Sequence, residues 1–183
     1  NLPCQDTCKD QRPSNAAEFR PMSPAIHPKL LKTDDLLRQR AIWRQQGRKV
    51  AFTNGCFDLL HAGHVHSLEA ARDLADILVV GLNDDASIRQ LKGTGRPLQT
   101  LQDRITVVGA LSCVCWLTVF CDTSVAALVH QVLPDVLVKG GDYDVADVVG
   151  ADAVQAAGGR VVITEHVQHT STTDLLARLR DVS

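Results

Sequence analysis

The sequence predicts an α/β fold, a doubly wound, Rossmann-like parallel sheet of five strands. Short apolar runs rich in valine and isoleucine alternate along the chain with segments of helical periodicity. The run Ile77–Leu82 contains no polar side chain, which is typical of a parallel strand covered on both faces. Polar residues follow several of these runs directly. Because the carboxyl ends of parallel strands share one edge of a sheet, these polar residues are expected to meet at a ligand crevice.

Each strand is predicted by a short run of β-branched or other apolar residues bounded by charged or turn residues. The strands are expected at residues 48–52, 77–82, 114–120, 136–138 and 161–163. Strands that alternate with helices in this way imply right-handed crossovers and helices on both faces of the sheet.

The helices are predicted by capping residues and by apolar positions three or four residues apart. Thr33 is expected to cap the first helix, and Gly47 lies just past its end. Thr100 and Asp103 form a capping box for the fourth. The helices are expected at residues 34–46, 63–74, 85–91, 101–111, 124–132, 145–157 and 172–179.

Composition bounds the class of protein. A chain of 183 residues with 45% hydrophobic content is long enough for one domain with a sizeable core. The proline-rich residues 1–28 are expected to form a disordered or extended arm, and residues 29–183 the folded domain. The net charge of −2 favours no nucleic-acid partner. No apolar run has membrane-spanning length and Asn1–Arg20 lacks the apolar core of a signal peptide, so a cytoplasmic location away from membranes is expected.

The cysteines are interpreted as small apolar residues in a reducing compartment. Cys113 and Cys115 would alternate on the third strand and so point to opposite faces, which opposes a metal site built from these adjacent positions. A zinc site that uses Cys113, Cys121 and a histidine remains open as an alternative.

The segment Phe52–His64 (FTNGCFDLLHAGH) carries the most chemical information. It runs from a strand through a tight turn to the start of a helix. His61 and His64 therefore lie where a helix offers unpaired backbone N–H groups and the positive end of its dipole. Such a helix start is suited to hold a phosphate chain.

Further motifs follow in order along the chain. They are residues 81–87 (GLNDDAS), 91–93 (LKG), Arg96-Pro97, Asp103-Arg104, 134–143 (PDVLVKGGDY) and 171–173 (STT). Together with the His-x-Gly-His segment at residues 61–64, this series resembles the His-x-Gly-His nucleotidyltransferase superfamily. It is most similar to the heptose 1-phosphate adenylyltransferases of the lipopolysaccharide-core pathway. The resemblance covers roughly residues 30 to 180 and implies a nucleotidyltransferase-type fold.

The resemblance implies transfer of AMP from ATP to heptose 1-phosphate, giving ADP-heptose and pyrophosphate. The catalytic residues would be His61, His64 and Lys139. The nucleotide-binding residues would be Phe52, Thr53, Asn54, Gly55, Phe57, Asp58, Gly63, Asp142, Ser171, Thr172 and Thr173. The acceptor-binding residues would be Asp85, Lys92, Arg96 and Arg104. Ser67 departs from the pattern, because the family usually carries an aromatic residue there.

Mg²⁺ is expected, held mainly by substrate phosphates and water rather than by a protein cage. The resemblance allows a homodimer and implies a separate sugar kinase by analogy. One rival interpretation is a cytidylyltransferase for glycerol 3-phosphate or phosphoethanolamine, although its usual Arg-Thr-x-Gly element is replaced here by residues 165–170 (EHVQHT). Another is a non-catalytic nucleotide-binding module.

Overall fold

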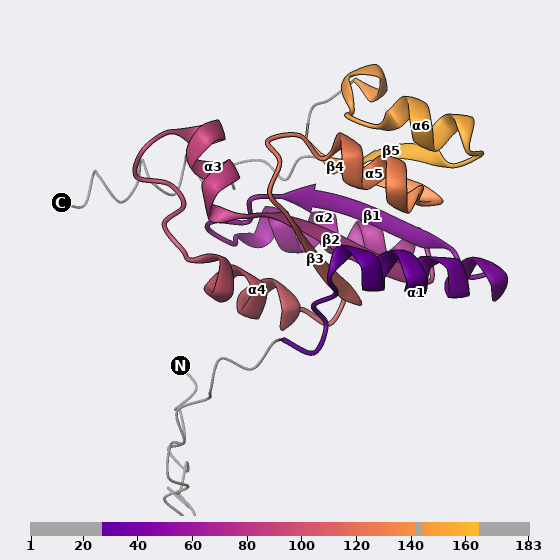
Figure 1. The fold of residues 1–183 in the computed structure, drawn as a ribbon, viewed down its shortest axis with the longest axis horizontal. Helices are drawn as coiled ribbons and strands as arrows, with labels where there is room; N and C mark the ends of the chain where they lie inside the picture. The colour runs from indigo at the N-terminus through magenta and orange to yellow at the C-terminus, as the bar shows by residue number, and fades with distance from the viewer. Residues whose placement is uncertain (1–26, 142–143, 165–183) are drawn as a thin grey trace, which may run out of the picture.

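The computed structural model describes residues 27–141 and 144–164. Within them, five parallel strands form one sheet in the order β3-β2-β1-β4-β5 (Figure 1). The strands are β1 (Val50–Gly55), β2 (Ile77–Asn83), β3 (Trp116–Phe120), β4 (Val136–Gly140) and β5 (Arg160–Thr164). The chain runs outward from β1 to β3 and then crosses to β4 on the other side of β1. The strand order therefore reverses between β1 and β4, which confirms the predicted doubly wound sheet.

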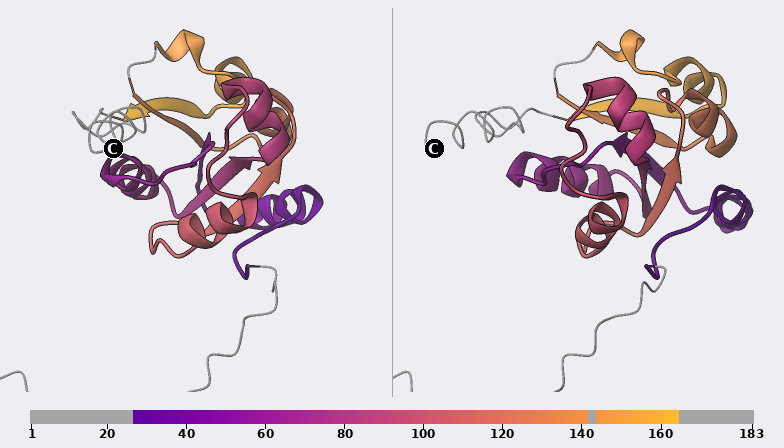
Figure 2. Two further views of the ribbon diagram at one scale, coloured as in Figure 1. Left: turned by 90° about the vertical axis from the view of Figure 1, so that its left-hand side faces the viewer. Right: turned by 60° about the vertical axis from the view of Figure 1, so that its left-hand side comes forward.

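Helices cover both faces of this sheet (Figure 2). One apolar cluster joins the sheet to α1 (Thr33–Gln45), α5 (Ala126–Val132) and α6 (Ala151–Ala156). A second cluster, on the opposite face, joins it to α2 (Ala62–Asp73) and α4 (Leu101–Gly109). The remaining helices are α3 (Asp85–Lys92), which follows β2, and the 3₁₀ helix η1 (Val145–Asp147).

Strand β2 is buried at every position because it lies between β1 and β3 and is covered on both faces. Its glycine, Gly81, allows close packing with β1. A Cβ atom at Gly81 would lie 2.9 Å from the ring of Phe52 and 3.4 Å from the Cβ of Asn54. The centre of the sheet is thus closely packed beside the carboxyl end of β1.

The segment before α1 covers the open edge of β3. The amide of Leu31 donates to the carbonyl of Leu117, and the amide of Leu117 donates to the carbonyl of Lys29, each at 2.8 Å. The Lys29 ammonium also donates to the carbonyl of Leu111 at 2.9 Å. The main-chain pairing protects an edge strand that would otherwise present unpaired backbone groups.

The prediction of one continuous helix over residues 145–157 is wrong, because the structure has two separate helices there, η1 and α6. Gly150 lies between them with φ +86°, and a Cβ atom there would approach Val129 to 2.6 Å. The left-handed backbone and the contact with α5 both require glycine at this position. The apolar periodicity of the sequence continues across residues 148–150. The break between η1 and α6 is therefore explained by the backbone of Gly150 and its contact with Val129.

Two smaller predictions about element boundaries are also wrong. Thr33 is the first residue of α1 rather than its cap, since Lys32 holds the cap position without a side-chain hydrogen bond. Strand β3 begins at Trp116, so Cys113 lies in a turn and Cys115 immediately precedes the strand. The argument from strand alternation therefore does not apply to these cysteines. Among the described residues no group of three or more His, Cys, Asp or Glu side chains is arranged to hold a metal ion.

Thr100 caps α4, its hydroxyl accepting from the amide of Asp103 at 3.2 Å, which is one half of the predicted capping box. The same hydroxyl donates to the Asp103 carboxylate at 2.6 Å. The predicted helix over residues 172–179 lies outside the described residues.

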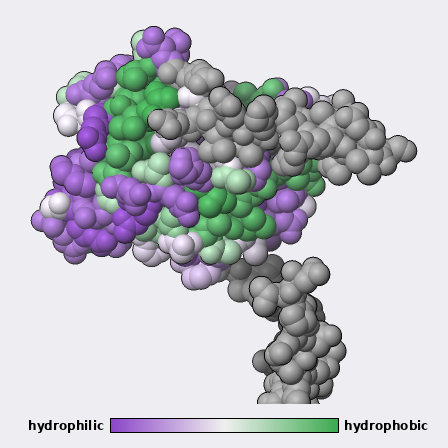
Figure 3. Space-filling model, turned by 180° about the vertical axis from the view of Figure 1, so that it is seen from behind, coloured by the Kyte–Doolittle hydropathy of each residue, from purple (hydrophilic) through white to green (hydrophobic). Residues whose placement is uncertain are grey.

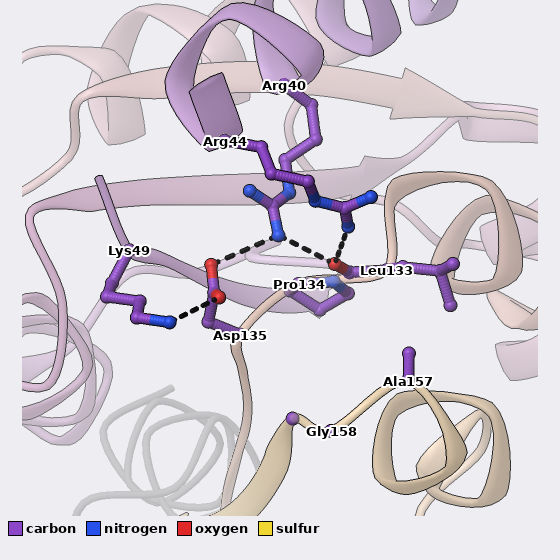
Figure 4. Close-up of a pocket in the computed structure, with 9 residues that line it drawn as sticks. Arg40, Arg44, Lys49, Leu133, Pro134, Asp135, Ala157 and Gly158 are labelled. Atoms are coloured by element: carbon purple, nitrogen blue, oxygen red, sulfur yellow. Dashed lines mark hydrogen bonds and ion pairs between the residues drawn. The ribbon is translucent and has the colours of Figure 1, made fainter. Parts of the chain in front are cut away.

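The edge at which the strands begin is held by Arg40 and Asp135 (Figure 4). The Asp135 carboxylate accepts from the amide of Val50 at 2.9 Å and pairs with Arg40 at 3.0 Å and Lys49 at 3.2 Å. Burial raises the pKa of Asp135, but these three donors outweigh it, so the pKa is lowered overall. A pocket of about 380 Å³ opens between these residues and Gly158. It lies at the amino ends of β1, β4 and β5, whereas His61 follows the carboxyl end of β1 and Lys139 lies at that of β4. Pro134 and Asp135, which begin the motif over residues 134–143, line this pocket, and we interpret its charges as structural.

The surface seen from behind carries apolar areas among hydrophilic ones (Figure 3). The large apolar side chains that are most exposed in the described part of the chain are Ile42, Leu91, Leu98, Val107 and Val149. They come from different elements, and single exposed apolar residues are ordinary on protein surfaces. None of the helices in residues 27–141 and 144–164 is both long and apolar enough to span a bilayer.

Candidate active site

The predicted motifs meet where β1 and β4 end. β1 and β4 are hydrogen-bonded neighbours on either side of the reversal in strand order. Asn54 and Gly55 form the end of β1, and Lys139 and Gly140 form the end of β4. A crevice at such a reversal is the usual ligand position in open parallel sheets.

His61 occupies the N-cap position of α2, directly before the first helical residue, Ala62. Its backbone is extended, with φ −138° and ψ 169°, and its carbonyl accepts from the amides of His64 at 2.9 Å and Val65 at 3.3 Å. The His61 side chain makes no capping hydrogen bond, so it does not occupy the amide groups of the first turn. Those amides therefore remain oriented along the positive end of the helix dipole.

The two imidazole rings of the motif are stacked. The ring centroids of His61 and His64 lie 3.8 Å apart with planes inclined by 29°. The ring of Phe57 also lies beside His64, with the two ring centroids 5.2 Å apart. Phe57 has a left-handed backbone with φ +47°, which turns the chain sharply after β1. A Cβ atom at Gly55 would lie 3.0 Å from the Phe57 ring, so this turn depends on glycine at the end of β1.

The protonation of His64 is strongly perturbed. Burial lowers its pKa to about 4, with further contributions from the nearby His61 and Lys92 and a weaker opposing effect from the backbone of Leu59. Its Nδ1 atom is buried, and among the described residues the only backbone group that affects the pKa is that of Leu59. His64 is therefore neutral at neutral pH, and an approaching anion would raise its pKa.

Lys139 lies at the carboxyl end of β4. Burial lowers the pKa of its ammonium group, and the nearby Cys56 thiol opposes this shift. This effect indicates that the Cys56 side chain, in the turn after β1, lies near the Lys139 side chain at the end of β4. The carboxyl ends of β1 and β4 thus bring side chains close to each other.

Asp58 and Arg96, predicted as nucleotide and acceptor ligands, are paired with each other. Nη1 of Arg96 donates to Oδ2 of Asp58 at 2.6 Å. The amides of Leu98 and Gln99 donate to Oδ1 of Asp58 at 2.7 and 3.0 Å. Burial raises the pKa of Asp58, but these donors outweigh it and lower the pKa overall.

Arg104 and Asp85, both predicted as acceptor ligands, form a second pair. Nη2 of Arg104 lies 2.8 Å from Oδ1 of Asp85, and Nη1 donates to the carbonyl of Cys56 at 2.7 Å. The Arg104 side chain is fully buried, whereas the Asp85 side chain is 31% exposed. The pair connects α4, the start of α3 and the turn after β1.

The other predicted ligands vary in position. Phe52 is fully buried in the core, and Thr53 is 7% exposed. Asn54 and Gly63 are half-buried at the end of β1 and the start of α2, and Lys92 is exposed at the end of α3. Asp142, Ser171, Thr172 and Thr173 lie outside the described residues.

Sequence reasoning missed a hydroxyl pair beside the site. The Oγ of Ser67 lies 2.7 Å from the Oγ1 of Thr164, which joins α2 to the end of β5. The available signal was the position of Ser67 three residues after His64, on the same side of the helix. Its partner could not be found without the fold.

Residues 52–177 match the family model described as cytidylyltransferase-like. The chain is 50% identical over 165 residues to the bifunctional protein HldE of Mesorhizobium japonicum, which covers 90% of this chain and 33% of that protein. It is 48% identical over 152 residues to the bifunctional protein HldE of Ectopseudomonas mendocina, covering 83% of this chain and 32% of that protein. The chain thus spans about a third of the length of these relatives.

Two solved structures are similar. The lipopolysaccharide core biosynthesis protein of Thermoplasma volcanium aligns with a TM-score of 0.55 and 25% identity, covering 68% of this chain and all (100%) of that one. The pantoate-beta-alanine ligase of Francisella tularensis aligns with a TM-score of 0.56 and 12% identity, over 82% of this chain and 76% of that one, and indicates the fold alone. By its match to the family model over residues 52–177, the chain belongs to the cytidylyltransferase-like family.

Proposed function

We propose that this chain transfers AMP from ATP to heptose 1-phosphate, with release of pyrophosphate and formation of ADP-heptose for the lipopolysaccharide core. The observation that carries the proposal is the stacked pair of His61 and His64 at a helix start beside the strand-order reversal. The identity of about 50% with HldE proteins and the motif resemblance support this choice of reaction within the family.

The reaction is an in-line displacement at the α-phosphorus of ATP. An oxygen of the sugar phosphate forms the new bond to phosphorus, and the bond to the pyrophosphate oxygen breaks. No covalent intermediate with the protein is needed, so the site acts by positioning and by stabilising charge. His61 and His64 would donate hydrogen bonds to the phosphate oxygens, assisted by the amides at the start of α2.

Lys139 would place a positive charge on the same triphosphate from the other side of the crevice. Its partial burial strengthens such an interaction, because little water screens it. Thr53, Asn54, Gly55 and Phe57 would line the nucleotide pocket at the end of β1. Asp142 and the hydroxyls of residues 171–173 are proposed nucleotide contacts on the resemblance alone.

The acceptor would lie on the side of α3 and α4. Lys92 is exposed and can reach a bound phosphate directly. Arg104 is fully buried and paired with Asp85, so it would contact the acceptor only if that pair rearranges. Arg96 is held by Asp58 and is proposed to act mainly through the position of its loop.

The divalent cation of the reaction is proposed to be Mg²⁺. Among the described residues, the predicted site carboxylates Asp58 and Asp85 are paired with arginines and so are poorly suited as metal ligands. The residues present therefore fit a cation that arrives with the triphosphate better than one bound in a protein cage. When bound, it would supply charge neutralisation on the phosphates.

The test is a pyrophosphate-release assay with ATP or CTP against a panel of sugar 1-phosphates, glycerol 3-phosphate and phosphoethanolamine. The proposal predicts turnover with ATP and heptose 1-phosphate. Turnover with CTP and not ATP would support the cytidylyltransferase instead. Nucleotide binding without pyrophosphate release for any acceptor would contradict an enzymatic role.

A further inference from the structure

We infer that Asp58 is a positioning residue, whose carboxylate fixes the Arg96–Gln99 end of the loop between α3 and α4 onto the turn that precedes His61. The inference rests on the proposed function for its catalytic consequence. It differs from a role in nucleotide binding, because Asp58 would act on the reaction only through the loop that follows Lys92, the last residue of α3.

The contacts of Asp58 support this role. Both carboxylate oxygens are engaged, Oδ2 by Arg96 at 2.6 Å and Oδ1 by the amides of Leu98 and Gln99 at 2.7 and 3.0 Å. The Asp58 side chain is 1% exposed. A nucleotide hydroxyl or amine could therefore reach it only by displacing these donors. All three donors belong to one short stretch 38 to 41 residues further along the chain.

The remainder of the loop is not held in the same way. Gly93 and Gly95 have φ +87° and +93°, and a Cβ atom at either position would meet no atom within 4 Å. The loop thus has a packed end at Arg96–Gln99 and an open end at Gly93–Gly95, directly after Lys92, the last residue of α3. Asp58 holds the packed end of the loop in place, and the open end is held by no comparable side-chain contact among the described residues.

The same anchor adjoins the imidazole pair. Phe57, the neighbour of Asp58, places its ring 5.2 Å from His64. Lys92, the last residue of α3, immediately precedes the open end of the loop and lies close enough to His64 for its charge to affect that ring. The Asp58 carboxylate therefore joins the loop that follows Lys92 to the turn that carries Phe57 toward the histidines. Its loss is expected to separate Lys92 from the site without removing any group that touches the nucleotide.

Limited trypsin digestion tests the anchor independently of catalysis. The Lys92–Gly93 bond is exposed, but trypsin needs an extended segment around it, so cleavage requires the loop to leave its anchored conformation. The Arg96–Pro97 bond is resistant to trypsin. Asp58→Ala and Arg96→Ala are expected to accelerate cleavage after Lys92 by about tenfold or more, because cleavage follows local opening. Asp76→Ala is the matched control, since Asp76 accepts an amide hydrogen bond from Lys49 at 2.7 Å at the opposite edge of the sheet. Unchanged cleavage in folded Asp58→Ala would overturn the inference.

Kinetics then separate positioning from nucleotide binding. Asp58→Ala is expected to lower kcat/KM for the sugar phosphate by about tenfold or more, with the Kd for ATP changed by less than about threefold. Lys92→Gln should lower activity in the wild-type background and add little in the Asp58→Ala background, because the two changes act through one loop. Additive losses, or a large rise in the Kd for ATP with unchanged cleavage, would identify Asp58 as a direct ligand and refute the inference.

The failure of the proposed function and the failure of the inference about Asp58 can be told apart. If the wild-type chain transfers no AMP, the proposed function fails, while the digestion still decides whether Asp58 holds the loop. If Asp58→Ala does not fold, Asp58→Asn and Arg96→Ala decide instead. Asparagine keeps an oxygen for the two amides but removes the charge that pairs with Arg96.

Discussion

The hydroxyl of Ser67 lies 2.7 Å from that of Thr164, and this hydrogen bond joins the helix of the imidazole pair to the last described strand of the sheet. The contact also involves β4, since a Cβ atom at Gly140 would lie 2.8 Å from the Ser67 oxygen. A larger residue at position 67 would meet both strand ends. The small side chain thus allows α2 to approach the carboxyl ends of β4 and β5 closely.

Ser67→Ala and Thr164→Val are each expected to lower the free energy of unfolding by about 1 kcal/mol, the usual net value of such a hydrogen bond. The double variant should lose little more than either single one, because both remove the same bond. Urea unfolding measures these values. Thr106→Val, on an exposed face of α4, is the control and should change stability less. Fully additive losses for Ser67 and Thr164 would show that the pair is not coupled.

Arg104→Met is expected to lower the free energy of unfolding by about 3 kcal/mol, because it leaves Asp85 and the carbonyl of Cys56 without their buried donor. Arg38→Met is the matched control. Arg38 pairs with Asp35 at 2.5 Å, but their side chains are 70% and 48% exposed, so the expected change is below about 0.5 kcal/mol. Thermal or urea unfolding distinguishes the two. Equal effects would mean that the Arg104 pair does not tie α4 to the site.

Stability is predicted to rise with pH between about 4 and 6.5 because of His64. Its pKa is about 4 in the folded chain and 6.5 in the reference state, so the unfolded chain binds more protons in this interval. The contribution is about 1–3 kcal/mol after allowance for partial exposure. It is complete above the unfolded pKa and is lost as the pH falls toward 4.

Urea unfolding of wild type and His64→Gln at several pH values measures this contribution. The variant should show a flatter dependence over the same interval. Asp58 acts in a different range, because its lowered pKa contributes stability that is lost only as the pH falls below the ordinary carboxylate value. Parallel curves for wild type and His64→Gln between pH 4 and 6.5 would refute the assignment to His64.

Gly55→Ala is expected to lower kcat more than it lowers the affinity for ATP. The added methyl group would lie 3.0 Å from the ring of Phe57 and displace it from its position beside His64. A loss of about tenfold in kcat is expected, since small displacements at a reacting site have large effects on rate. Gly55→Ala combined with Phe57→Leu should recover part of that loss. If Gly55→Ala retained the kcat of the wild type, the packing of Phe57 would have no bearing on catalysis.

The elements that local patterns determine were predictable from the sequence. The apolar run of β2 and the three-residue spacing after Gly63 both predict what the structure contains, because each reflects burial of a single element. The polar motif residues also lie at the predicted strand ends. Long-range pairing was not predictable: Asp58 and Arg96 lie 38 residues apart in the sequence.

The incorrect predictions have the same physical origin. The apolar spacing in residues 145–157 continues across Gly150, and the glycine alone does not determine a break, which depends also on the contact with Val129 of α5. Likewise, the sequence places Asp85 and Arg104 near the site without indicating that they neutralise each other. The family resemblance therefore indicated these charged groups as site candidates, whereas their mutual pairing emerged only from the fold.

The most direct test of the account is the kcat for AMP transfer in His61→Ala and His64→Ala, compared with His66→Ala. His66 lies on the same helix but is exposed, so it controls for the loss of an imidazole from α2. The account predicts that kcat falls by about 100-fold or more in the first two variants and by less than about twofold in the third, with circular dichroism unchanged in all. Full activity in either His61→Ala or His64→Ala would contradict the central role of the stacked pair.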